Sequence, residues 1–70
     1  MSTYYTDAAA YAAARKAAKA ARDWRYVVTE GYGPDRVYGV ASDYDLETFW
    51  FGAAVVTAIG PDGQPEHCDA

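Results

Sequence analysis

The sequence predicts an α+β fold in which an N-terminal alanine-rich helix packs on a three-stranded antiparallel sheet. Alanine, the strongest intrinsic helix former, fills ten of the seventeen positions between Thr6 and Arg22. After Asp23 the chain changes to aromatic and β-branched residues, which favour strands. Because the chain has only 70 residues, we expect residues 1–70 to form a single domain with a small core.

The helix is expected over residues 7–22, because local signals define both of its ends. Thr6 is a suitable N-cap, Asp7 lies at the positive end of the helix dipole, and basic residues gather toward the negative end. At about 3.6 residues per turn, alanines line the side opposite the basic residues, so we expect this alanine stripe to pack on the sheet. The stripe consists of Ala10, Ala13, Ala14, Ala17, Ala20 and Ala21, and the basic side consists of Arg15, Lys16, Lys19 and Arg22.

A β-hairpin is expected over residues 24–41, because its two ends are rich in aromatic and β-branched residues while the glycines and Pro34 between them favour a loop. The third strand, residues 53–59, is apolar on both faces except at Thr57, so we expect it to be well covered. The polar residues 64–70 are expected to form a flexible tail, or at most a short edge strand.

Residues 42–51 fit two conformations, of which a helical turn is the favoured one. A strand would carry a row of three carboxylates at a repeat of roughly 6.6 Å, which is on the scale of successive phosphates along a nucleic-acid strand. A short helix would begin at a capping residue and place apolar side chains on one face. In both conformations the carboxylates point to water and the rings point inward. The carboxylates are Asp43, Asp45 and Glu47, the capping residue is Ser42 or Asp43, and the apolar side chains are Leu46, Phe49 and Trp50.

The charges are distributed unevenly along the chain, although the net charge is only −4. Residues 1–25 carry five basic and two acidic residues, which gives this part a net charge of +3. Residues 26–70 carry eight acidic residues and one basic residue, Arg36, which gives a net charge of −7. We therefore expect one basic and one markedly acidic side.

The sequence carries no catalytic, cofactor-binding or metal-binding signature, so we expect a protein that is not an enzyme and takes no cofactor or metal. Its only histidine, His67, adjoins its only cysteine, Cys68, whereas a structural zinc site needs four ligands. A single cysteine also excludes an internal disulfide, which suits the cytoplasm. No run of residues is apolar enough for a signal peptide or a membrane span. We expect a monomer in the cytoplasm that does not contact membranes.

The basic and acidic sides are the two candidate binding surfaces. The basic side, extended by Arg25, could hold a nucleic-acid backbone, but direct nucleic-acid binding is not expected of a net-acidic chain. The acidic side also offers tyrosines, which are enriched among the residues that dominate interface energies. We expect it to bind a basic protein surface through Glu30, Tyr32, Asp35, Asp43, Tyr44, Asp45 and Glu47.

In its small size, its acidity, its order of elements and its exposed Asp, Glu and Tyr residues, the chain resembles the anti-CRISPR and anti-restriction proteins carried by phages. This resemblance implies inhibition by binding. An acidic, tyrosine-bearing surface would dock on the basic DNA-recognition surface of a host defence complex, with a type I CRISPR surveillance complex as the favoured target, and would exclude DNA. The alternatives are a phage accessory or antitoxin-like interaction module, and a nucleic-acid binder that uses the basic helix.

Overall fold

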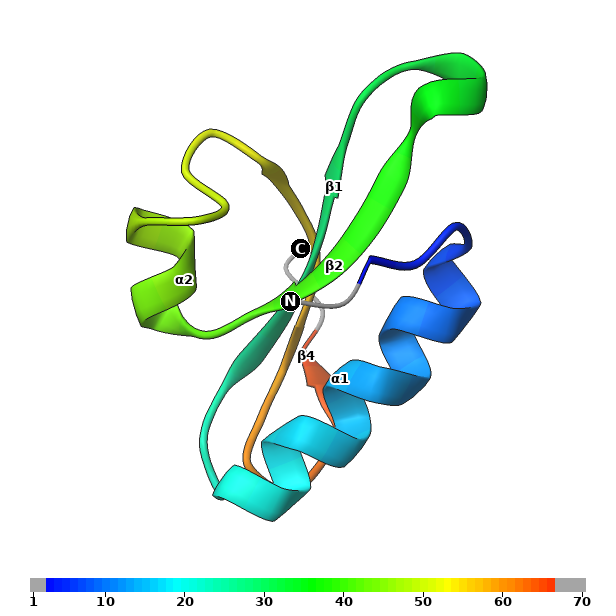
Figure 1. The fold of residues 1–70 in the computed structure, drawn as a ribbon. Coiled ribbons are helices and arrows are strands. Elements are labelled where there is room, and N and C mark those ends of the chain that lie inside the picture. The colour runs from blue at the N-terminus through cyan, green and yellow to red at the C-terminus, as the bar shows by residue number, and fades with distance from the viewer. Residues whose placement is uncertain (1–2, 67–70) are drawn as a thin grey trace.

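The computed structural model describes residues 3–66 and places an antiparallel sheet between helix α1 on one side and helix α2 on the other (Figure 1). The sheet has four strands in the order β2-β1-β3-β4, so β1 and β3 lie at its centre. This confirms the α+β fold with a helix on an antiparallel sheet, although the sheet gains a fourth strand. The elements are α1 (Asp7–Ala21), β1 (Arg25–Glu30), the 3-10 turn η1 (Gly33–Asp35), β2 (Val37–Ala41), α2 (Asp43–Glu47), β3 (Ala54–Ile59) and β4 (Pro65–Glu66).

The ends of α1 follow from local chemistry. The Thr6 hydroxyl accepts a hydrogen bond of 3.2 Å from the backbone N–H of Ala9, which satisfies one of the free donors of the first turn. At the other end Arg22 adopts a left-handed conformation, with φ of 54°, and the backbone N–H of Asp23 donates to the carbonyl of Ala18. The chain then turns directly into β1.

The buried face of α1 differs in part from the predicted alanine stripe. Ala10, Ala14 and Ala18 are completely buried, whereas Ala20 and Ala21 are exposed, so the prediction was wrong at these last two positions and missed Ala18. Residues four apart form a single ridge along a helix, and this ridge is the one that enters the sheet. Ala20 and Ala21, at the end of the helix, lead into the connection to β1 and lie outside this ridge.

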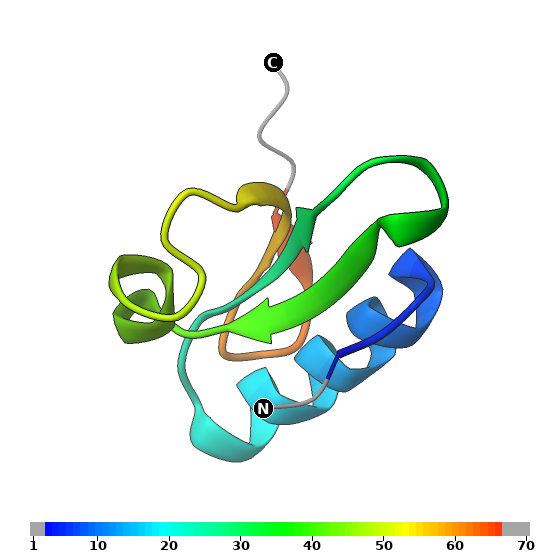
Figure 2. The same ribbon diagram turned by 45° about the horizontal axis from the view of Figure 1, so that its top comes forward.

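The sheet is covered on both faces, because neighbouring residues of a strand point to opposite sides. Val27 of β1 packs with the α1 alanines and Ile59, and half-buried tyrosines and Val40 surround them. Val28 points to the other face, where it packs with Ala41 and Trp50 under α2 and the loop that follows it. Figure 2 shows this loop and α2 on the side of the sheet opposite α1. The segment of uncertain conformation therefore supplies the second half of the core.

Residues 42–51 contain the short helix α2, which confirms the helical alternative and rules out the extended row of three carboxylates. Trp50 points inward and is buried, and Leu46 is half-buried against it. The expectation that all the rings point inward was wrong, because Phe49 and Phe51 are exposed. Only one of these three consecutive residues can reach the core, because the chain turns sharply here.

The two outer strands of the sheet, β2 and β4, differ in what lies along their edges. At the β2 edge, Tyr4 and Tyr38 exchange two backbone hydrogen bonds of 2.8 Å, so the N-terminal segment pairs with the strand. At the other edge, β4 pairs only with Ala58 and Ile59 of β3. Of the two predicted alternatives for this segment, the short edge strand is present as β4, and residues 67–70 of that prediction lie outside the described residues.

The third strand is confirmed as β3, but its expected cover is missing over half of its length. Ala54, Val55 and Val56 are exposed, whereas Ile59 is buried. The helix α1 crosses the other half of the strand, and β4 is too short to reach the first residues. A register shift opposite Val27 and Val28 places one extra residue, Val56, in β3.

Candidate functional site

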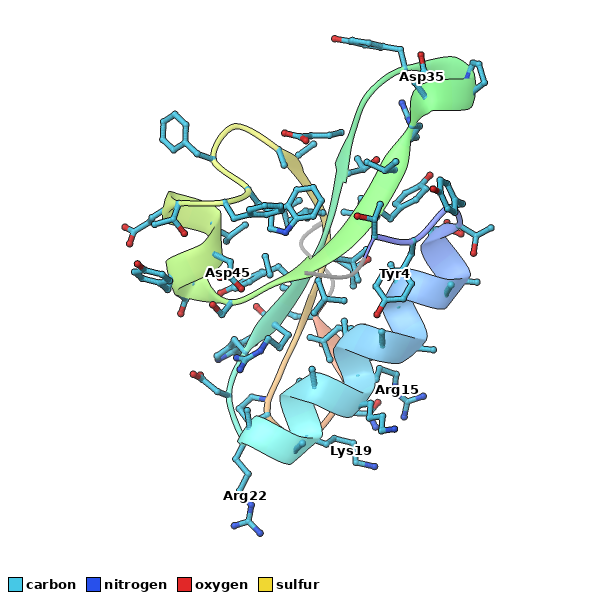
Figure 3. All side chains as sticks on the ribbon, in the orientation of Figure 1. Tyr4, Arg15, Lys19, Arg22, Asp35 and Asp45 are labelled. Atoms are coloured by element: carbon cyan, nitrogen blue, oxygen red, sulfur yellow. The ribbon has the colours of Figure 1, made fainter. Side chains whose placement is uncertain are left out.

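The side chains predicted to bind a partner fall into two groups at opposite ends of β2, as Figure 3 shows for Asp35 and Asp45. The five residues of β2 separate the two groups by roughly 16 Å at about 3.3 Å per residue. The fold therefore does not gather the seven side chains around one point. The hairpin group is Glu30, Tyr32 and Asp35, and the α2 group is Asp43, Tyr44, Asp45 and Glu47.

The hairpin group is exposed but electrostatically mixed. Tyr32 is 87% exposed and leads into the 3-10 turn that contains Asp35. Arg36 lines the same surface hollow as Glu30 and Tyr32, so a positive charge lies among the carboxylates. Opposite charges this close cancel much of the local field, and this group makes a weak acidic surface.

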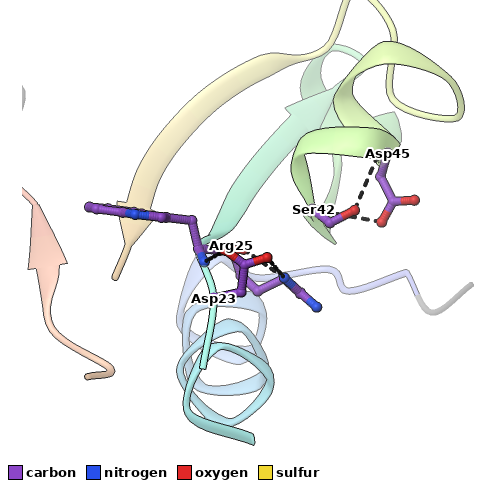
Figure 4. Close-up of polar contacts among 5 residues, drawn as sticks. Asp23, Arg25, Ser42 and Asp45 are labelled. Carbon is purple, nitrogen blue, oxygen red and sulfur yellow. Dashed lines mark hydrogen bonds and ion pairs between the residues drawn. The ribbon is translucent and has the colours of Figure 1, made fainter. Parts of the chain in front are cut away.

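Within the α2 group, Asp45 has a structural role. The Ser42 hydroxyl accepts a hydrogen bond of 3.2 Å from the backbone N–H of Asp45, and the Asp45 carboxylate accepts one of 3.1 Å from the backbone N–H of Ser42 (Figure 4). This reciprocal capping box fixes the start of α2. Asp45 is half-buried as a result and has less of its charge to offer a partner.

The other acidic residues of α2 remain available to bind a partner. Asp43 and Glu47 lie four positions apart and so share one side of the helix, and Tyr44 between them is 72% exposed. On the sheet beneath lies Tyr26, and hydrogen bonding of its hydroxyl to the Asp43 carboxylate, together with burial, raises the pKa of Tyr26 above its ordinary value of 10.0.

Two further carboxylates, Asp23 and Glu66, belong to the same surface. The sheet register aligns Ala41, Tyr26, Ala58 and Glu66 across four strands, and residues aligned in this way point to the same face. The negative charges of Asp43, Asp23 and Glu66 also raise the pKa of Tyr26. We call this surface the acidic face and define it as Asp23, Asp43 and Glu66 around Tyr26, with Tyr44 and Glu47 on α2.

Sequence reasoning missed two members of the acidic face for different reasons. Asp23 directly follows the basic helix and was assigned to the basic part of the chain. Glu66 was assigned to a flexible tail, and only the pairing of β4 with β3 brings it beside Tyr26. A local signal for the role of Asp45 did exist, because Ser42 and Asp45 are three positions apart, which is the spacing of a capping box.

An open groove of about 520 Å³ adjoins the acidic face at Glu66. Trp24, Pro61 in the β3–β4 connection and Pro65 in β4 give it apolar walls, and Asp62 and Glu66 give it negative charge. Trp24 is held by a hydrogen bond of 2.8 Å from its backbone N–H to the Asp23 carboxylate (Figure 4). An aromatic ring next to carboxylates favours a cationic side chain.

The basic side of α1 is partly used to hold the fold together. The guanidinium Nε of Arg15 donates a hydrogen bond of 3.0 Å to the carbonyl of Gly63 in the β3–β4 turn. The aliphatic part of Lys19 packs over the same glycine, so closely that a β-carbon there would lie 2.7 Å from it. All four basic residues are exposed, but only Lys16 and Arg22 make no such contact with the turn. The basic side is therefore a smaller binding surface than the sequence suggests.

Among residues 3–66, no group of three or more His, Cys, Asp or Glu side chains is arranged to hold a metal ion. His67 and Cys68, which the sequence analysis rejected as metal ligands, lie outside this range. In the same part of the chain, no helix is both long enough and apolar enough to cross a membrane.

No protein-family model, no curated protein and no solved structure matches the chain.

Proposed function

We propose that this protein is a non-enzymatic inhibitor that acts in the bacterial cytoplasm. It binds a basic DNA-recognition surface of a host defence nucleoprotein complex, with a type I CRISPR surveillance complex as the favoured target, and so excludes DNA. The acidic face, rather than the hairpin group, makes this contact. The small size of the chain, its net charge of −4 and its resemblance to phage inhibitors support this proposal.

One observation carries the proposal: three separate parts of the chain converge to build the acidic face. Asp23 follows α1, Asp43 begins α2, and Glu66 in β4 is aligned with Tyr26 through Ala58, and the negative charges of all three raise the pKa of Tyr26. The only positive partner of this cluster among the described ion pairs is Arg25, whose guanidinium nitrogen lies 3.9 Å from Asp23 (Figure 4). Asp43 and Glu66 stay free to attract a cationic surface.

The groove beside Glu66 suits the chemistry of such a partner. DNA-recognition surfaces carry arginines and lysines that normally contact phosphates. One of these side chains can lie between Trp24 and the carboxylates of Asp62 and Glu66. Tyr44 adds an exposed ring at the far side of the acidic face, where it can become a desolvated anchor in the complex.

The proposal is tested by competition on a purified type I surveillance complex that carries its guide RNA. Pre-bound protein is expected to prevent binding of target DNA, and excess DNA is expected to slow association of the protein. Binding is also expected to weaken as the salt concentration rises, because charged surfaces steer the encounter. Simultaneous occupancy by DNA and protein with unaltered affinities contradicts the proposal.

Matched charge reversals separate the two acidic groups. Asp43→Lys combined with Glu66→Lys is expected to weaken binding by about tenfold or more, since both carboxylates lie on the acidic face. Asp35→Lys, at the hairpin, is expected to change binding by less than about twofold because Arg36 already offsets its charge. A larger effect of Asp35→Lys would assign the contact to the hairpin.

A gel shift with free DNA separates this function from the nucleic-acid-binding alternative. The protein is expected to leave duplex DNA unretarded up to concentrations of about 10 μM, because the acidic face and the net charge repel phosphate. If DNA is retarded, and the double variant Lys16→Glu with Arg22→Glu abolishes the retardation, the basic side of α1 is the binding surface instead.

A further inference from the structure

The groove beside the acidic face has a glycine at its base. Gly60, which directly follows β3, is buried next to Trp24 and Asp62, and all three residues line the groove. A β-carbon at Gly60 would lie 3.6 Å from Cη2 of the Trp24 ring and 3.4 Å from Oδ1 of Asp62. Because both distances start from the same point, the ring and the oxygen are no more than about 7 Å apart, which one guanidinium group can span by stacking on the ring and donating a hydrogen bond to the oxygen.

The other residues of the groove supply the remaining contacts that an arginine side chain needs. Pro61 and Pro65 are apolar and can cover the aliphatic part of the side chain, and Glu66 adds a second carboxylate. Among residues 3–66, neither Asp62 nor Glu66 forms an ion pair, so both negative charges can meet a cation of the partner. The volume of about 520 Å³ lies within the range of small-ligand sites.

Hydrogen bonds hold this groove in shape before a partner binds. The backbone N–H of Gly60 donates a bond of 3.0 Å to the carbonyl of Gln64, and the N–H of Gly63 donates one of 2.9 Å to the carbonyl of Gly60. The N–H of Gln64 donates a bond of 3.0 Å to Oδ1 of Asp62, and Arg15 ties the same turn to α1. A site that needs no rearrangement loses less conformational entropy when it binds.

We propose that this groove is an arginine-selective pocket, in which a guanidinium of the partner stacks on the Trp24 ring and donates hydrogen bonds to Asp62 and Glu66. Arginine is favoured over lysine because its guanidinium is planar, weakly hydrated and carries five donors for the two carboxylates. The ammonium of lysine is strongly hydrated and offers no flat face to the ring. That this arginine belongs to a DNA-recognition surface rests on the proposed function, whereas the selectivity for arginine rests on the groove alone.

The pocket is tested by an NMR titration of the full chain with arginine and with lysine, each blocked at its α-amino and carboxyl groups, at constant ionic strength. Blocked arginine is expected to shift the indole N–H signal of Trp24, and blocked lysine is expected to bind at least about threefold more weakly. The indole N–H of Trp50 serves as the internal reference, because that ring is buried under α2 and its loop. Equal affinities for the two probes, or shifts no larger at Trp24 than at Trp50, overturn the proposal.

Gly60→Ala is the most direct variant, because it places a methyl group at the base of the pocket. This methyl group would meet its neighbours only at ordinary van der Waals distances, and Gly60 does not have a positive φ, so the Tm is expected to stay the same. Blocked arginine is expected to bind at least about fivefold more weakly. The matched control, Tyr32→Leu combined with Asp35→Asn, removes an exposed ring and a carboxylate at the hairpin and is expected to bind like the wild type. Arginine binding that Gly60→Ala leaves unchanged overturns the proposal.

Glu66→Gln provides a second variant that does not alter the base of the pocket. It removes one exposed negative charge, keeps the shape of the side chain and is expected to weaken the binding of blocked arginine by about threefold. Unchanged binding in this variant removes Glu66 from the pocket and contradicts the proposal.

Comparison with the DNA competition experiment separates the pocket from the proposed function. A protein that binds arginine at Trp24 but does not exclude DNA from the surveillance complex overturns the proposed function and leaves the pocket in place. A protein that excludes DNA but shows no selectivity for arginine overturns the pocket alone.

Discussion

Trp50 packs directly over Gly39, in the space that a side chain at position 39 of β2 would need. A β-carbon at Gly39 would lie 2.7 Å from two atoms of the indole ring, closer than any ordinary contact. Glycine normally weakens a strand, so its presence here reflects the close approach of Trp50. This contact locks the loop after α2 onto the second face of the sheet.

Gly39→Ala is therefore expected to lower the free energy of unfolding by about 1–3 kcal/mol, because the ring has to move out of a packed core. The sign of the change is diagnostic. Where a strand glycine has free space above it, alanine stabilises the fold by about 0.5–1 kcal/mol. Chemical denaturation measures the change, and a more stable Gly39→Ala protein would contradict the placement of Trp50. In a Trp50→Leu background the penalty is expected to shrink.

The approach of α1 to the sheet depends on the small size of its buried side chains. Ala14→Leu inserts a large side chain between helix and sheet and is expected to cost about 1–3 kcal/mol of stability. Ala12 lies on the exposed side of the same helix, so Ala12→Leu is expected to change stability by less than about 0.5 kcal/mol. Thermal unfolding of the two variants compares them directly, and equal Tm values would show that a different face of α1 packs on the sheet.

Arg15 and Lys16 are neighbours with different expected roles. Arg15→Ala removes the hydrogen bond to the Gly63 carbonyl and is expected to destabilise the protein by about 0.5–1.5 kcal/mol. Lys16→Ala is expected to have almost no effect, since its side chain is exposed and helix propensity rises slightly. Urea denaturation checks both values. A loss of stability of the same size for Lys16→Ala would mean that general charge, and not the contact with Gly63, is responsible.

Tyr26 gives a prediction about pH. Because its hydrogen bond to Asp43 and its burial raise its pKa above 10.0 in the folded state, the folded protein holds this proton more tightly than the unfolded chain does. Its contribution to stability is thus fully present below about pH 10 and is lost as the pH rises through the raised pKa.

Denaturation of the wild type and of Tyr26→Phe over a range from about pH 8 to about pH 12 tests this. The stability difference between the two proteins is expected to be constant at the lower end and to move in favour of Tyr26→Phe as the pH rises. Asp43→Asn provides the control, because it removes the negative charge next to the hydroxyl and should weaken the pH dependence. A difference that does not change with pH would contradict the position of Tyr26 in the acidic face.

Local signals in the sequence were sufficient for most of the elements. The N-cap at Thr6, the glycines and Pro34 of the hairpin, and the change from alanine to aromatic residues are each recognisable within a few positions. The pairing of strands is not local. The extra residue at Val56, the pairing of Glu66 with Ala58, and the choice of Ala18 for the buried ridge all depend on how distant segments meet.

The candidate site was predicted only in part for the same reason. The polar composition of the α2 segment is enough to predict that Asp43 and Tyr44 are exposed. It does not predict that carboxylates gather around Tyr26, because this arrangement depends on the sheet register that brings Asp23 and Glu66 together. An even spacing of charges along a sequence therefore says little about a surface until the conformation between the charges is known.

The pairing of Tyr4 with Tyr38 sets a limit on aggregation. A sheet with two open edges can add molecules at both and grow without end, as amyloid fibres do. Here a further strand cannot lie along β2 unless it displaces Tyr4. Among residues 3–66, the outward backbone groups of Tyr38 are therefore already paired and are not available to another molecule. Removal of the first five residues would uncover the second edge, and we expect such a truncated protein to form filaments where the intact chain stays in small, soluble species.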